Sequence, residues 1–150
     1  MRKSKGFTLI ELMVVIVILG ILAAVIAPRI PQFVNKAKEG RTKGNLGTLR
    51  STLNIYYSDN DGIYPLDTLT ASLVPKYIKK IPDVVIPGAH VDSVSTVVAD
   101  ATAGALGPTD TSGWCYENLN AQTNWGDICV NCSFHKDNNN ASTGSAWSSF

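Results

Sequence analysis

The longest apolar stretch of the chain runs from Phe7 to Ala27 and contains one ionisable side chain, that of Glu11. Its 21 residues are enough for a helix to cross the hydrocarbon core of a bilayer, which is about 30 Å thick. The stretch is longer than the core of a secretory signal peptide. A cut after Ala27 would also precede Pro28, which signal cleavage tolerates poorly. We therefore predict a membrane-spanning helix rather than a removable signal peptide.

Charge is distributed unevenly over the 150 residues, although the formal net charge is only +1. Residues 29–50 contain six basic side chains and one acidic side chain, whereas residues 81–150 contain seven acidic side chains and one lysine. Because more basic residues follow the apolar stretch than precede it, the positive-inside rule favours a cytoplasmic C-terminus. The three cysteines beyond the stretch favour an oxidising compartment instead. No aromatic platform accompanies the basic residues, so we predict no specific nucleic-acid partner.

Glu11 is the residue of the apolar stretch that indicates a function. A carboxylate inside a membrane helix costs about 2.5–3.5 kcal/mol to insert, so its presence points to a functional site. If the chain is cut after Gly6, the new terminus is the α-amine of Phe7, which is charged at neutral pH. In a bundle of identical helices this amine lies at almost the depth of a neighbouring Glu11 carboxylate. A simpler role also stays open, in which Glu11 offsets the dipole of its own helix terminus.

The segment from Gly6 to Met13, with the short basic leader before it, resembles the prepilin cleavage and methylation motif. That motif is shared by type IV pilins and the pseudopilins of type II secretion. The resemblance implies cleavage after Gly6 and N-methylation of Phe7 by a prepilin peptidase and methyltransferase. It further implies that Phe7 and Glu11 join identical subunits into a helical filament. Gly20 and Pro28 lie where helices of this family loosen on entering the filament, and both residue types weaken a helix.

The same resemblance implies a location and partners. The subunit is expected to cross the inner membrane once, with its head in the periplasm, before it joins an extracellular pilus at the cell surface. Its expected partners are further copies of itself and the pilus or secretion assembly machinery. The main hypothesis is a type IV pilus subunit, and the alternative within the family is a pseudopilin of a type II secretion system.

The predicted fold is α+β, with a long N-terminal helix packed on a small C-terminal antiparallel sheet. We divide the chain into a leader (1–6), a membrane-spanning or filament-core half-helix (7–28), an amphipathic half-helix (29–58) and a globular head (59–150). The amphipathic half follows from apolar residues at three- and four-residue steps. These residues are Leu46, Leu49, Leu53 and Tyr56.

Turn residues and alternation predict the elements of the head. Asp59-Asn60-Asp61-Gly62 predicts the end of the helix, because as a calcium loop it would place Tyr57 and Thr68 at ligand positions. A short helix is expected around Leu66, Leu69 and Leu73. The sheet is expected to have three or four strands, including a hairpin closed by the loop 120–126. Its expected strands are Val94–Val98, Trp114–Leu119 and Asp127–Cys132.

The three cysteines allow several interpretations. In a hairpin register centred on Gln122, Cys115 faces Cys129, so this pair is our candidate disulfide, and Cys115–Cys132 stays open. A redox pair in Cys129-x-x-Cys132 is less favoured, because the motif lies in a strand rather than at the start of a helix. A zinc site that adds His135 is a further, weaker alternative.

The sequence offers little support for catalysis. It contains two histidines, His90 and His135, and no convincing set of nucleophile and base. We therefore predict no metal, no cofactor and no enzymatic activity. A membrane-anchored enzyme and a monomeric anchored binding domain are the rival hypotheses to a structural filament subunit.

Overall fold

The computed structural model describes residues 6–87, 94–99, 111–121 and 123–132. The chain divides into two compact units, Met1–Lys36 and Ala37–Phe150. The long N-terminal helical stretch and the small C-terminal sheet confirm the predicted α+β class.

The first unit is built on the helix α1 (Leu9–Ile26). None of the 18 residues of α1 is buried. Thr8 caps its N-terminus, so the helix begins two residues after the predicted start. Gly20 lies inside an uninterrupted α-helix, whereas Pro28 lies in the short 3-10 helix η1 (Ala27–Arg29). Proline lacks an amide hydrogen and its ring crowds the preceding turn, which explains why the regular helix stops there and resumes as α2.

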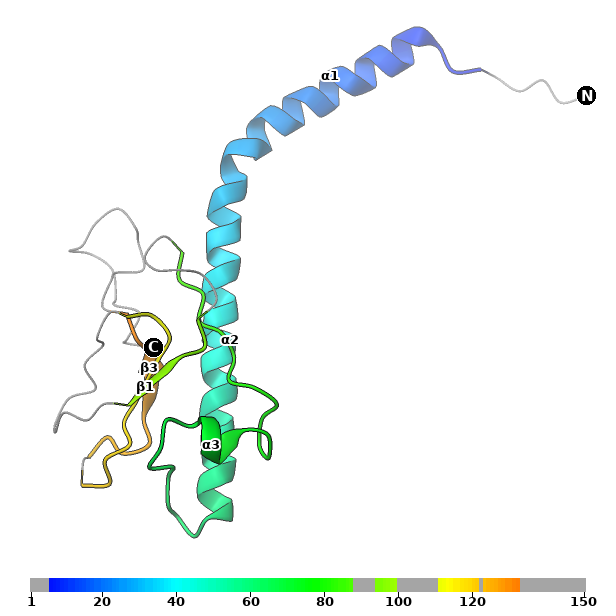
Figure 1. Ribbon diagram of the computed structural model, residues 1–150. Helices are drawn as coiled ribbons and strands as arrows, with labels where there is room; N and C mark the ends of the chain where they lie inside the picture. Colours follow the sequence, from blue (N-terminus) through cyan, green and yellow to red (C-terminus); the bar gives the residue numbers. More distant parts are fainter. Residues whose placement is uncertain (1–5, 88–93, 100–110, 122, 133–150) are drawn as a thin grey trace, which may run out of the picture. The chain divides into compact units, whose positions relative to one another are not determined.

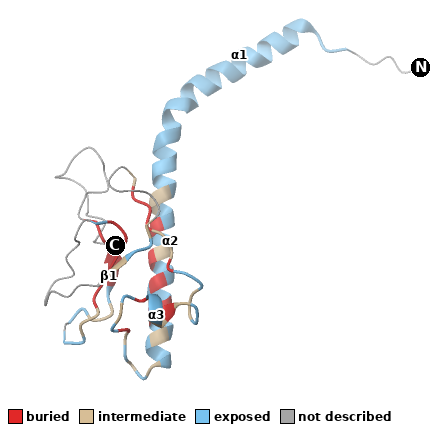
Figure 2. Cartoon of the chain, viewed as in Figure 1, coloured by how far each residue is buried: buried red, intermediate tan, exposed pale blue. Residues whose placement is uncertain are grey.

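The helix α2 (Ile30–Asp59) buries one face between Thr42 and Leu53, and Figure 2 shows buried positions along this part of the helix. The helix ends where the sequence predicts, since Asn60 donates a hydrogen bond back to the Tyr56 carbonyl and Asp61 and Gly62 adopt positive φ angles. The buried residues of α2 are Thr42, Leu46, Leu49, Thr52 and Leu53.

The sheet of the second unit has the strand order β1-β2-β3 among the described residues. Its strands are β1 (Val97–Ala99), β2 (Trp114–Tyr116) and β3 (Ile128–Val130), drawn in Figure 1 beside α2. β2 and β3 are antiparallel with Cys115 opposite Cys129, which confirms the register centred on Gln122.

The sheet is mixed rather than antiparallel, because β1 runs parallel to β2. Alternation identified a strand near Val94–Val98, but it carries no information on the direction of the neighbouring strand. Val94 itself lies outside β1 and pairs with Val84 in an isolated antiparallel bridge. The strand therefore begins three residues later than predicted.

The hydrophobic core lies between the second half of α2, the sheet and the connection between them. The short helix α3 (Thr70–Leu73) covers part of it, although it is shorter than predicted. Gly126 has a φ of 88°, and a Cβ atom there would overlap the ring of Tyr64, so glycine permits this close approach. The core residues include Leu49, Leu53, Leu73, Trp114, Tyr116, Ile128, Val130 and Cys132.

Candidate functional site

The start of α1 places Glu11 in a reciprocal capping arrangement with Thr8. The Thr8 amide and hydroxyl both donate hydrogen bonds to Glu11 Oε2, over 2.8 and 2.6 Å. The Glu11 amide in turn donates to Thr8 Oγ1 over 3.3 Å. This capping box satisfies amides that the first turn of a helix leaves without a carbonyl partner. It also fixes the carboxylate at the N-terminal end of the apolar helix.

The two carboxylate oxygens of Glu11 differ in their surroundings. Oε2 receives both Thr8 donors, whereas no hydrogen bond from any described residue reaches Oε1. Glu11 also borders an open apolar groove of about 380 Å³ on one side of the helix. An amine from outside the chain can therefore reach Oε1 without displacing Thr8. The groove is lined by Phe7, Ile10, Glu11, Val14 and Val15.

This geometry corrects one expectation, because the Glu11 carboxylate does not stand alone in the isolated chain. Thr8 supplies two donors, so the cost of carrying the charge into lipid is lower than for an unpaired carboxylate. The structure places Glu11 in the first turn of α1, as the simpler role requires, in which its charge offsets the dipole of its own helix terminus. The sequence contained the signal for Thr8, since a threonine three residues before a glutamate and ahead of an apolar run predicts a capping box.

Gly6 and Phe7 precede the cap and lie outside the helix, and both are exposed. The Phe7 side chain is 83% exposed. The peptide bond between them is therefore accessible, and its position leaves the whole of α1 intact after a cut. This arrangement suits a cleavage site, because a protease needs an extended, accessible segment rather than a helix.

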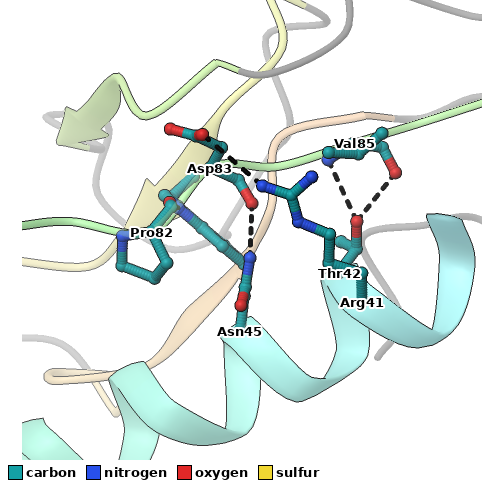
Figure 3. Close-up of polar contacts among 7 residues, drawn as sticks. Arg41, Thr42, Asn45, Pro82, Asp83 and Val85 are labelled. Carbon is teal, nitrogen blue, oxygen red and sulfur yellow. Dashed lines mark hydrogen bonds and ion pairs between the residues drawn. The ribbon is translucent and has the colours of Figure 1, made fainter.

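A second group of polar contacts joins α2 to the segment that precedes the sheet (Figure 3). Thr42 Oγ1 donates to the Val85 carbonyl over 2.7 Å and accepts from the Val85 amide over 3.0 Å. Asn45 donates to the Asp83 carbonyl over 2.7 Å, and the Arg41 guanidinium lies 3.7 Å from the Asp83 carboxylate. Sequence reasoning missed this group, because neither threonine nor asparagine at these positions belongs to a local motif.

The indole of Trp114 completes these contacts by donating to the Pro82 carbonyl over 2.7 Å. The segment that carries Pro82 and Val85 has no regular secondary structure apart from the bridge at Val84, so its backbone groups need partners from elsewhere. Side chains of α2 and β2 supply them. The contacts thus hold the head to the middle of α2, around residues 41–45.

The cysteines lie on the two faces of the hairpin. Cys115 and Cys129 share one face, whereas Cys132 belongs to the core on the other face with Trp114 and Val130. Hydrogen bonds two residues away on either side show that Cys115 and Cys129 occupy a hydrogen-bonded pair of the ladder. Such pairs have Cα atoms about 5.5 Å apart, within the range of disulfides. The geometry favours the pair Cys115–Cys129 over Cys115–Cys132.

Among the described residues, no group of three or more histidine, cysteine, aspartate or glutamate side chains is placed to hold a metal ion. His90 and His135, and with them the zinc alternative, lie outside the described residues. One helical stretch, Leu9–Asp59, is long and apolar enough at its start to cross a membrane.

The N-terminal part of the chain, which contains Glu11, also matches a known family model. The family model described as the prokaryotic N-terminal methylation motif matches residues 1–27. The fimbrial protein EcpC of Eikenella corrodens is 36% identical over 110 residues, which cover 71% of this chain and 69% of that protein. The type II secretion system core protein G of Pseudomonas aeruginosa is 40% identical over 96 residues, covering 54% of this chain and 67% of that protein.

A third relative matches a shorter part of the chain. The type IV major pilin protein PilA of Myxococcus xanthus is 41% identical over 59 residues, which cover 39% of this chain and 27% of that protein. No solved structure is significantly similar to the chain.

Proposed function

We propose that this chain, which belongs to the family of type IV pilins and type II secretion pseudopilins, is the structural subunit of a type IV pilus. We further propose that it has no enzymatic activity. The observation that carries the proposal is the start of α1, where Glu11 keeps one oxygen open at the end of a helix with no buried residue. Such a helix has no partner within its own described unit. Polymerisation supplies that partner in the form of further copies of α1.

Glu11 gives the assembly its register. Moving an apolar helix from lipid into a bundle of apolar helices gains little hydrophobic free energy, because lipid tails are equally apolar. The carboxylate differs between the two environments. In lipid only Thr8 compensates it, whereas in the filament the α-amine of a neighbouring Phe7 donates to Oε1. This pair favours the assembled state and fixes the axial position of each subunit.

The amine exists only after the leader is removed. A prepilin peptidase cuts the accessible bond between Gly6 and Phe7, and methylation of Phe7 follows. Before assembly α1 holds the subunit in the inner membrane with its head in the periplasm, where the cysteines meet oxidising conditions. Gly20 and Pro28 are the positions at which the helix loosens when the subunit enters the filament.

Replacing Glu11 by glutamine tests the proposal. The variant keeps the size of the side chain and one acceptor oxygen for Thr8 but loses the charge and the second acceptor oxygen. Removing one partner of a buried ion pair costs about 3–5 kcal/mol, so we expect filament yield to fall about 100-fold or more. Membrane insertion and head folding should be unchanged. Glu39→Gln, which removes a charge from the second unit, serves as the control. Normal filaments from Glu11→Gln would refute the role of the carboxylate.

The pseudopilin is the second candidate, because relatives that are type II secretion core proteins align with up to 42% identity. The fimbrial relative favours the pilus, since its alignment covers 71% of this chain, whereas that of the Pseudomonas type II secretion protein covers 54%. Electron microscopy with an antibody against the head separates the two candidates. Long labelled surface fibres support the pilus, whereas loss of protein export in a deletion strain without surface fibres supports the pseudopilin.

A further inference from the structure

The residues just beyond α1 combine exposed apolar and basic side chains. Arg29, Phe33 and Lys36 follow one another at steps of four and three residues, so they lie along one stripe of the helix. All three are exposed, and Phe33 is 62% exposed. Ile30 and Val34 beside them are exposed as well. Figure 2 shows this part of the chain without any buried residue.

If α1 spans a bilayer, its length places the stripe where hydrocarbon changes to headgroups. The 18 residues of α1 span about 27 Å, close to the roughly 30 Å of the hydrocarbon core. Arg29 comes three residues after the end of α1, and Lys36 lies two turns, or about 10 Å, further along. Aromatic residues flanked by lysine and arginine are typical of membrane interfaces, because the ring contacts the acyl boundary while the cations reach the phosphates.

Acidic residues near the stripe are few, and the nearest along the chain, Glu39, lies one turn beyond Lys36 and forms an ion pair with Lys43 over 3.2 Å. Glu11 is the only acidic residue in positions 1–36, and it lies 18 residues before Arg29, at the other end of α1. A second copy packed at the same depth would present the same two cations and would repel them. Anionic phospholipids carry the opposite charge, and a headgroup phosphate accepts hydrogen bonds from guanidinium and ammonium groups.

We propose that the segment 29–36 binds the headgroups of anionic phospholipids through Arg29 and Lys36, with Phe33 at the acyl boundary. The inference rests on the part of the proposed function in which α1 spans the membrane, and it holds for either leaflet. It also gives a role to basic residues whose position after the span runs against the positive-inside rule when the head is periplasmic.

The full-length chain in neutral detergent micelles, with equal amounts of phosphatidylglycerol and phosphatidylcholine added, provides the test. Native mass spectrometry counts the lipids that each chain retains. Two cations near the phosphates predict a roughly 10- to 30-fold preference for phosphatidylglycerol. The double variant Arg29→Gln/Lys36→Gln should lose this preference, and Arg29→Lys/Lys36→Arg should keep it. Lys79→Gln/Lys80→Gln removes the same charge from exposed lysines of the second unit and should behave as wild type.

Three results would overturn the inference. Wild-type chains could retain both lipids equally, Arg29→Gln/Lys36→Gln could keep the preference, or the Lys79/Lys80 variant could lose it to the same extent. Cross-linking between copies at Phe33 that depends on Arg29 and Lys36, with no lipid preference, would assign the stripe to a second copy instead. Flotation of all variants with vesicles separates a loss of lipid preference from a loss of membrane insertion, because a chain that does not insert does not float.

Discussion

α1 and the second half of α2 are both regular helices, yet they obtain their stability from different sources. No residue of α1 is buried, whereas α2 buries five residues between Thr42 and Leu53. The backbone of α1 is satisfied within the helix, so its apolar side chains need only an apolar environment, which a membrane or other copies provide. The second half of α2 obtains its environment from its own chain. Substitutions in the first region should therefore affect assembly, and substitutions in the second should affect folding.

A pair of leucine-to-alanine substitutions tests this difference with the largest expected effect. Leu49 is 0% exposed within the core, whereas Leu19 is 58% exposed on α1. Leu49→Ala should lower the free energy of unfolding of the head by about 2–5 kcal/mol, because it removes buried contacts and leaves a cavity. Leu19→Ala should leave that free energy unchanged. Denaturant unfolding of the full chain in detergent, followed by tryptophan fluorescence, measures both. Equal losses would mean that the two regions fold as one unit.

The cysteines sharpen the comparison, because all three lie in the second region. We expect a disulfide between Cys115 and Cys129, which closes a loop of about 15 residues and stabilises the head by about 3 kcal/mol. Reduction should lower the stability of the head without changing the helicity of α1. Peptide mapping under non-reducing conditions should recover the peptides of Cys115 and Cys129 linked to each other. Finding Cys132 in a disulfide would contradict the arrangement of the two faces of the hairpin.

Thr42 tests the polar attachment of the head to α2. Thr42→Val keeps the shape of the side chain but leaves the amide and carbonyl of Val85 without their partner. We expect a loss of about 1–3 kcal/mol in the unfolding of the head. Thr48→Val is the matched control, because the exposed Thr48 hydroxyl donates to the Gly44 carbonyl of its own helix. If both variants are equally stable, the Thr42 contacts do not hold the head in place.

The two regions also differ in how far the sequence predicts them. Local patterns gave the span with Glu11, the leucine stripe of α2, the helix end at Asp59 and the register that places Cys115 opposite Cys129. Each depends on residues close together in the chain, where the spacing of side chains is fixed by the helix or the hairpin. The capping role of Thr8 belongs to the same class, although it was read only from the structure.

The rest depends on contacts between distant segments. The bonds between Thr42 and Val85 join residues 43 positions apart, and no local pattern marks either as a partner. The parallel pairing of β1 with β2 likewise depends on the path of the connection, part of which lies outside the described residues. Sequence reasoning therefore predicted the assembly region more completely than the attachment of the head.

The smallest expected effect concerns Tyr116, a buried residue of β2 whose hydroxyl donates to the Pro65 carbonyl over 2.7 Å. Burial, and secondarily the negative charge of Asp67, raises the pKa of Tyr116 well above its usual value. As the pH rises past about 10, the unfolded chain loses this proton first, so the stability that Tyr116 contributes is full below pH 10 and declines above it.

Tyr116→Phe should lower the free energy of unfolding by about 1 kcal/mol at neutral pH, because it leaves the Pro65 carbonyl without its donor. The variant lacks the alkaline titration of this residue, so its disadvantage should shrink between about pH 10 and pH 11. Unfolding curves of wild type and variant at both pH values isolate the contribution of Tyr116 from that of the other tyrosines. A constant difference would mean that Tyr116 titrates alike in the folded and unfolded chain, and that the head, like α1, leaves this side chain open to its surroundings.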